Sequence, residues 1–268
     1  MNKDLSWDAE VFENVVARLN EIDRVLHLCV QGLNMIHGHP EFVQKAMAYM
    51  KSRGKDVEFD EDDWTRRIEI SKSNAQFAEE EISRSFPVLH ANAAIAIWAT
   101  LEVLVNDLVV GYLVAEPSLL QNDPLRKVKI TVSNFYSLDE QDRLKYVIDQ
   151  HSRTFGIELR QGASRFESLL EIVGLQGPID EEIRKTLFEL SEVRNVLVHR
   201  ARIADRRLAS ACPWLGLKAG DSLQISHERY LSYTHAAHAY VHELMVRVLT
   251  VLECITRDEA GARLNRQS

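Results

Sequence analysis

The sequence predicts an all-α protein, a multi-helix bundle built from long helices. Apolar residues recur every three or four positions along most of the chain, which is the helical period. Only 11 glycines and 6 prolines occur in 268 residues, whereas a β-sandwich or barrel needs a turn roughly every 8–12 residues. With 46% hydrophobic and 27% charged residues, the chain can form a proper core.

The apolar spacing places four helices in the first half of the chain, at approximately 8–36, 41–53, 64–85 and 87–115. Gly54 is a suitable left-handed cap for the second helix. Six acidic residues crowd into 56–63, and the last of them favour the start of the third helix. Ser85 and Pro87 predict a cap and a first-turn proline for the fourth helix.

The second half is expected to contain helices at about 138–153, 165–173, 180–202 and 228–257. The first two would open with capping boxes, Ser137-x-x-Glu140 and Ser164-x-x-Glu167, and Asp180 would cap the third. Two stretches allow β-structure. One is 127–135, where apolar and polar residues alternate, and the other is a short hairpin near 209–227, a segment with Pro213, Gly216 and Gly220.

The most apolar stretch, 93–115, is long enough to cross a membrane, but we expect it to lie inside the protein. Glu102 falls near its middle, with Asn106 and Asp107 one turn later. A carboxylate at the centre of a bilayer costs about 2.5–3.5 kcal/mol. No lysine or arginine lies within the stretch or just after it to anchor an end, so no membrane contact is expected.

Charge and cysteine usage suggest a cytoplasmic protein with one local basic site. The formal net charge of −8 argues against a protein that coats nucleic acid through many lysines and arginines. From Arg194 to Arg207, however, five arginines stand against a single acid, Asp205. The start of the chain has no signal-peptide pattern, and the three cysteines are too far apart to form a disulfide framework.

Arg194 falls within the apolar stripe of the helix that begins at Asp180. The stripe contains Ile183, Leu187, Leu190, Leu197 and Ala201. A cation there must find a carboxylate or reach a cleft, and Glu102 is the obvious ion-pair partner. The opposite face collects Glu192, Asn195, His199, Arg202 and Arg206. On that face Asn195 and His199 are one turn apart and able to touch.

The segment Arg194-Asn195-Val196-Leu197-Val198-His199 resembles the R-x4–6-H motif of the HEPN (higher eukaryotes and prokaryotes nucleotide-binding) superfamily. Members are helical and carry the motif on a late helix that another long helix follows. The resemblance covers about residues 87–257. It differs from many relatives at Arg200, where a tyrosine or glycine often follows the histidine.

The resemblance implies a metal-independent endoribonuclease that needs no cofactor and works on RNA as a homodimer, with two motif copies in one cleft. His199 would be the general base or acid, Arg194 would stabilise the phosphate, and Asn195 would orient His199 or the substrate. The RNA backbone would contact Arg200, Arg202, Arg206 and Arg207. A toxin or anti-phage effector with an antitoxin or other partner protein is the implied role.

The corresponding domain arrangement is an N-terminal helical extension over 1–60, a HEPN-like helical domain over 61–258 and a C-terminal tail over 259–268. Two non-enzymatic alternatives remain open. In one, the chain is a HEPN-like binding or scaffold protein and Arg194 is a structural ion-pair residue. In the other, it is a helical subunit that docks into a larger complex through its first helix.

Two further features bear on the site. Arg194 and His199 are about 140° apart on a straight helix, so either the helix ends or bends near His199 or the site forms across a two-fold axis. His235, His238 and His242 share one face of the last helix, but without a neighbouring acid or cysteine they predict polar or subunit contacts and no metal. The chain has neither a Gly-rich phosphate loop nor a G-x-S-x-G motif.

Overall fold

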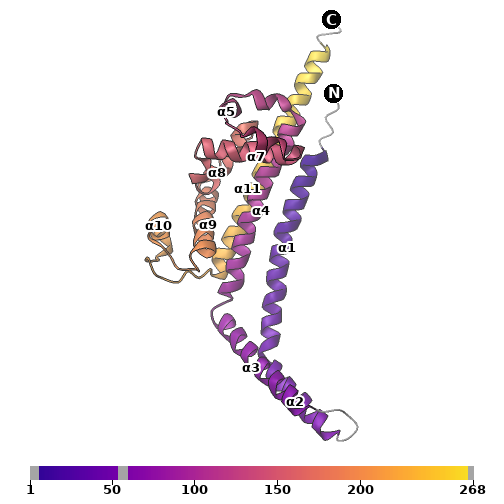
Figure 1. The fold of residues 1–268 in the computed structure, drawn as a ribbon, viewed down its shortest axis with the longest axis vertical. Helices are drawn as coiled ribbons and strands as arrows, with labels where there is room; N and C mark the ends of the chain where they lie inside the picture. Colours follow the sequence, from indigo (N-terminus) through magenta and orange to yellow (C-terminus); the bar gives the residue numbers. More distant parts are fainter. Residues whose placement is uncertain (1–5, 54–59, 265–268) are drawn as a thin grey trace. The chain divides into compact units, whose positions relative to one another are not determined.

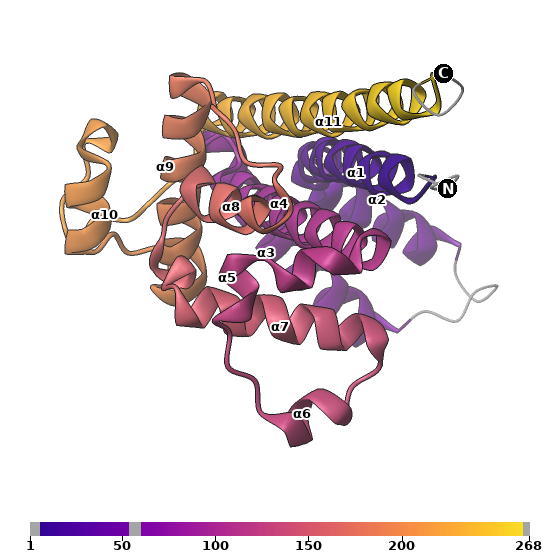
Figure 2. The same ribbon diagram turned by 90° about the horizontal axis from the view of Figure 1, so that it is seen from above.

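The computed structural model describes residues 6–53 and 60–264, with 252–264 described as backbone alone, and it confirms the all-α fold (Figures 1 and 2). The longer helices are α1 (Ser6–His37), α2 (His39–Ser52), α3 (Glu61–Ser83), α4 (Pro87–Ala115), α7 (Glu140–Thr154), α8 (Ala163–Leu170), α9 (Glu181–His199) and α11 (His227–Leu264). The short α-helices are α5 (Asp123–Arg126), α6 (Val132–Tyr136) and α10 (Arg206–Ala211). Four 3₁₀ turns connect them: η2 (Pro117–Gln121), η3 (Ile157–Leu159), η4 (Glu171–Val173) and η5 (Pro213–Leu215).

The chain divides into two compact units. One unit contains Met1–Asn20, Ala94–Leu223 and Leu231–Ser268, and the other contains Glu21–Ala93 and Gln224–Tyr230. The helices α1, α4 and α11 each contribute to both units. The division therefore falls within long helices.

In the smaller unit, α2 and α3 pack against each other (Figure 1). Asp60 caps α3 by accepting hydrogen bonds from the amides of Asp62 and Asp63, at 2.9 and 3.1 Å, as the acidic run predicts. The predicted cap at Gly54 and the start of the acidic run lie outside the described residues. The start of α3 thus depends on a carboxylate, in agreement with the helix dipole.

The cap predicted at Ser85 is wrong, because a carboxylate from the preceding helix takes its place. Glu81, which is 5% exposed, accepts a hydrogen bond from the amide of Val88 at 3.1 Å. Ser85 and Phe86 form the turn between α3 and α4 with φ angles of 60° and 58°, a left-handed conformation that side chains other than glycine rarely adopt. A charged acceptor binds the helix N-terminus more strongly than a hydroxyl does.

The core of the larger unit is formed around α4. Leu101, Leu104 and Leu108 are fully buried, as are many residues of α9 and α11. Among the described residues, α4 is the single helix long and apolar enough to cross a membrane, but just over half of its most apolar window is buried within the protein. Trp98 of α4 stacks on Phe166 of α8 with ring centres 4.7 Å apart, which fixes α8 against α4.

Both predicted capping boxes are wrong. The cap of α7 is Asp139, whose carboxylate accepts a hydrogen bond from the amide of Asp142 at 2.9 Å. Ser137 instead donates a hydrogen bond to the carbonyl of Asn134. At the other site, α8 begins after Gly162 and Ser164 lies inside the helix. Asp is at least as good an N-cap as Ser, so a pattern match alone did not decide between neighbouring acceptors.

The strand considered over 127–135 is absent, since α6 begins at Val132. No strand lies beside this segment in the described part of the chain, and an isolated strand has no ladder partner. The hairpin near 209–227 is replaced by a single antiparallel bridge between Ile203 and Ser222. The bridge closes a loop that contains α10, and two backbone hydrogen bonds support it, from Ala204 to Asp221 and from Leu223 to Arg202, both at 2.8 Å.

Gly162 lets α8 approach the backbone of α9. Its φ angle is +58°, and its amide donates a hydrogen bond to Ser191 Oγ at 3.0 Å. A Cβ atom at this position would lie 2.6 Å from the Cα of Phe188. The contact places α8 on α9 (Figure 2), so the glycine helps to set the position of every α8 side chain relative to α9.

We expect Gly162→Ala to lower the free energy of unfolding by about 2–3 kcal/mol, because it combines backbone strain with a clash against backbone atoms. Gly174→Ala is the matched control: its φ angle is +73°, but the new Cβ would meet nothing within 4 Å. This control should cost only about 1 kcal/mol, from the left-handed conformation. Urea denaturation measures both, and equal losses would mean that the clash is relieved.

Candidate functional site

The structure brings Arg194 and Glu102 together, and adds a third residue. Arg194 Nη2 lies 3.8 Å from Glu102 Oε2, across the contact between α9 and α4. The other carboxylate oxygen, Oε1, accepts a hydrogen bond from Arg165 Nη1 of α8 at 2.8 Å. Glu102 therefore holds two arginines, which we call the arginine pair (Arg165 and Arg194). Sequence analysis did not single out Arg165, because nothing local distinguishes it from other surface arginines.

The arginine pair keeps an excess positive charge and unused hydrogen-bond donors. Two guanidinium groups share the single carboxylate of Glu102, whose side chain is 21% exposed. At 3.8 Å, Arg194 is in ionic contact with Glu102 but beyond normal hydrogen-bond distance. Its Nε atom is buried and has no hydrogen-bond partner among the described residues. With 28% of its side chain exposed, Arg194 can still offer donors to an anion.

His199 is the last residue of α9, and its side chain is exposed. The helix predicted to reach about residue 202 ends here, because Ala201 and Arg202 adopt φ angles of 48° and 66°. The helix therefore ends at the motif. Asn195 is half-buried, and in the described part of the chain no hydrogen bond joins it to His199.

The arginines after His199 differ in their surroundings. Arg200 is exposed, with its Nε 3.8 Å from Asp205. Arg206 is exposed as well, whereas Arg202 is half-buried and its Nε has no partner within the described ranges. Arg207 is engaged by the protein, since Nε and Nη2 donate to the two carboxylate oxygens of Glu192, both at 2.9 Å.

The face of α9 that was predicted to be polar is covered at Glu192, and Glu189 one turn earlier is covered as well. Glu192 is only 2% exposed and pairs with Arg207 of α10. Glu189 is 7% exposed and accepts hydrogen bonds from Tyr233 Oη, at 2.7 Å, and from the Trp214 indole. Buried carboxylates need such partners, so we interpret these contacts as structural.

A further, half-buried carboxylate links α8 to α11. Glu167 accepts hydrogen bonds from Tyr240 Oη at 2.8 Å, from Arg247 Nη1 at 2.9 Å and from the amide of Gly177 at 2.7 Å. Burial, together with the negative charge of Glu167, raises the pKa of Tyr240 well above its ordinary value. Glu167 thus organises tertiary contacts and is not the helix cap that the sequence suggested.

The three histidines of the last helix differ in their exposure. His235 and His242 are exposed and His238 is half-buried. Across the described residues, no group of three or more His, Cys, Asp or Glu side chains is arranged to hold a metal ion.

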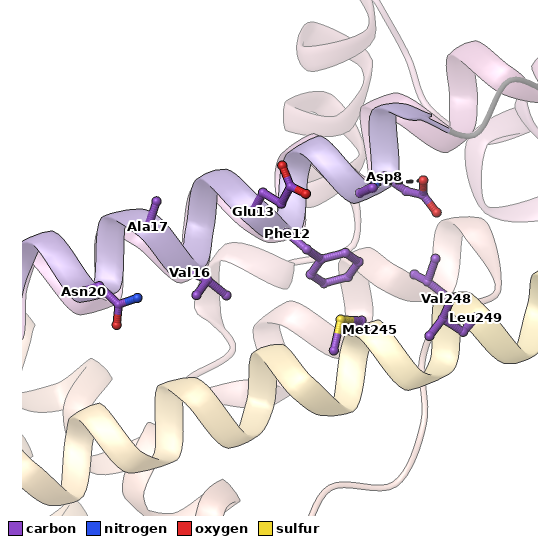
Figure 3. A pocket seen from close by; sticks show the side chains of 10 residues that line it. Asp8, Phe12, Glu13, Val16, Ala17, Asn20, Met245, Val248 and Leu249 are labelled. Atoms are coloured by element: carbon purple, nitrogen blue, oxygen red, sulfur yellow. Dashed lines mark hydrogen bonds between the residues drawn. The ribbon is translucent and has the colours of Figure 1, made fainter.

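An apolar groove of about 740 Å³ lies between the first turns of α1 and the middle of α11. Figure 3 shows Phe12 and Val16 pointing toward Met245, Val248 and Leu249. The groove contains none of the predicted site residues. A smaller and more polar cavity, of about 220 Å³, borders α7 and α8, and its lining includes His151 and Glu171.

Two histidines are buried, and no neighbouring carboxylate fully offsets the effect of burial on their pKa values. His90, 2% exposed, has its pKa lowered by burial and further by the proximity of His227. His151, 4% exposed, has its pKa lowered by burial, which the negative charge of Glu171 only partly offsets. Both rings are therefore expected to be neutral at pH 7.

Stability should fall as the pH drops below about 6.5, the ordinary histidine value. At that point the unfolded chain protonates His90 and His151, whereas the folded chain resists because both pKa values are lowered. Each histidine lowers the free energy of unfolding by at most about 1.4 kcal/mol per pH unit. Melting temperatures from pH 8 to pH 5 should fall less steeply in His90→Asn/His151→Asn than in the wild type. The exposed control His242→Asn should follow the wild-type profile.

These observations define one candidate site: the arginine pair on Glu102, followed by the exposed His199 at the end of α9. Comparison of the chain with protein-family models, curated proteins and solved structures found no match.

Proposed function

We propose that the chain is a metal-independent endoribonuclease of HEPN type that acts in the cytoplasm as a homodimer. The observation that supports this most directly is the arrangement around α9. A carboxylate holds Arg194 in place with donors to spare, and an ionisable, exposed histidine follows where the helix ends. The resemblance would place such an activity in a toxin or an anti-phage effector controlled by a partner protein.

The chemistry matches these residue types. In cleavage by the 2′-hydroxyl, a base removes the 2′ proton while the 2′ oxygen attacks phosphorus. The bond from phosphorus to the 5′ oxygen breaks, and an acid protonates that oxygen. A histidine can serve as either group near neutral pH. Arg194 would bind the phosphate oxygens and stabilise their growing charge, with Arg165 beside it. The products are a 2′,3′-cyclic phosphate and a 5′-hydroxyl.

The homodimer follows from the number of proton-transfer groups. The reaction needs one acid and one base, and each chain supplies a single His199 in the motif. A two-fold axis near the end of α9 would bring the second His199 to the same phosphate. Arg200 and Arg206, both exposed, would then extend the positive surface along the RNA.

One observation favours a non-catalytic alternative. The ion pairs around Glu102 tie α4, α8 and α9 together, which is what a structural role for Arg194 in a helical binding or scaffold protein would require. On that view, removal of the Arg194 charge should weaken the fold and no RNA should be cut.

The two functions are separated by incubating the protein with labelled RNA in EDTA. A ribonuclease yields 2′,3′-cyclic phosphate ends, and light scattering shows a dimer at micromolar concentration. Arg194→Gln should then be inactive but well folded, because Arg165 still neutralises Glu102. Arg184→Gln, an exposed arginine on the same helix, is the matched control. A strict monomer, or cleavage that Arg194→Gln leaves unchanged, would contradict the proposal.

A further inference from the structure

The polar cavity of about 220 Å³ has the make-up of a binding site for a planar ring. Its floor includes Ile157 and Ile172, each 3% exposed, and so offers a dry apolar surface. Phe155 also lines the cavity, is 41% exposed, and lies against the ring of His151 with ring centres 4.8 Å apart, so one part of its aromatic surface is open to a ligand. Apolar floors and exposed aromatic rings are how proteins bind unpaired nucleobases.

The same cavity contains polar groups that lack partners. His151 is 4% exposed, and its Nδ1 atom is buried without a hydrogen-bond partner in the part of the chain that the structure describes. Buried polar atoms nearly always have a partner, so this atom is available for a hydrogen bond with a bound molecule. Glu171 also lines the cavity; it is exposed, and its negative charge acts on His151. Arg160, which also lines the cavity, donates one hydrogen bond to Ser168, three residues before Glu171, and keeps its other donors.

The cavity adjoins the candidate site along α8. Ser168, which lines the cavity, is three residues after Arg165 of the arginine pair. Side chains three apart on a helix are neighbours, with Cβ atoms about 5–6 Å apart. A single strand with its phosphate on the arginine pair can therefore place an adjacent base in the cavity.

We propose that this cavity binds a guanine base of the RNA, an inference that rests on the proposed ribonuclease function for the source of the base. Guanine presents two adjacent donors, N1–H and the N2 amino group, which match the two oxygens of a carboxylate such as Glu171. Its O6 is an acceptor for Arg160, and its ring would lie on the isoleucine floor beside Phe155. Adenine presents an unprotonated N1 to the carboxylate and is disfavoured.

Direct binding tests the cavity independently of cleavage. Calorimetry with the full-length protein should show that GMP binds about tenfold more tightly than IMP, which lacks the N2 amino group. The ratio of GMP affinity to AMP affinity should be larger still. Glu171→Gln should lose at least about tenfold in GMP affinity with an unchanged melting temperature. Phe155→Ala should weaken all three nucleotides. Glu158→Gln, an exposed acid outside the cavity lining, should bind like the wild type.

No binding of GMP at millimolar concentration, equal affinity for GMP and AMP, or an unaffected Glu171→Gln variant would each overturn the inference. Cleavage of matched oligonucleotides identifies the source of the base. Replacing guanosine by inosine beside the cut should slow the reaction about tenfold, and indifference to it would rule out RNA as the source. Failure to cut any RNA contradicts the proposed function alone, because the GMP result stands without it.

Discussion

The His199→Ala variant should lose RNA cleavage by about 10²- to 10⁴-fold while folding like the wild type. The side chain is exposed, and no described residue forms a hydrogen bond or ion pair with it, so the free energy of unfolding should change by less than about 0.5 kcal/mol. In a homodimer the change removes both proton-transfer groups at once. Single-turnover cleavage and thermal denaturation measure the two effects separately. The exposed His242→Ala on α11 is the matched control and should remain active.

A subunit-mixing experiment extends this prediction to the shared cleft. When wild-type protein exchanges subunits with a tenfold excess of the His199→Ala variant, nearly every wild-type chain is paired with an inactive partner. Cleavage should then fall well below the value of the same amount of undiluted wild type. Activity that depends only on the amount of wild-type chain would show that each protomer acts alone.

Helical periodicity was sufficient to predict the class of fold and the positions of the long helices. The prediction of helix caps succeeded where only one good capping side chain lies near the start of the helix. Asp180 caps α9 as expected, with amide hydrogen bonds to Glu182 and Ile183 at 2.9 and 3.2 Å. The cap prediction was wrong where several hydrogen-bond acceptors lie close together, as at Ser137 and Asp139. It was also wrong where a residue of the preceding helix, Glu81, supplies the cap. These outcomes depend on tertiary approach, which sequence spacing does not encode.

In the candidate site, too, some contacts could be predicted from the sequence and others could not. The contact between Glu102 and Arg194 could be predicted because each charge lies in an apolar stretch and needs the other. Arg165 could not, since its role depends on how Gly162 packs α8 on α9. The helical wheel also placed Glu192 on an open polar face. The structure covers it with Arg207 of α10, a helix too short to leave a periodic pattern.

The Glu167→Ala variant should be among the most destabilised single substitutions in this chain, by about 3–5 kcal/mol. Glu167 is the carboxylate partner of Arg247, and their side chains are only 16% and 11% exposed. Its removal leaves the guanidinium charge buried and takes the acceptor from the Tyr240 hydroxyl, on a residue that is fully buried. Urea denaturation gives the loss directly.

The control for this prediction uses the same arginine. Glu243 lies 3.4 Å from the Nε of Arg247, but its side chain is 44% exposed and solvent screens the pair. We therefore expect Glu243→Ala to cost less than about 1 kcal/mol. A double variant, Glu167→Leu/Arg247→Met, should recover part of the loss, because it removes the buried charge together with its partner. Equal costs for Glu167→Ala and Glu243→Ala would mean that water reaches Arg247 from the α8 side and that the carboxylate of Glu167 does not hold α8 on α11.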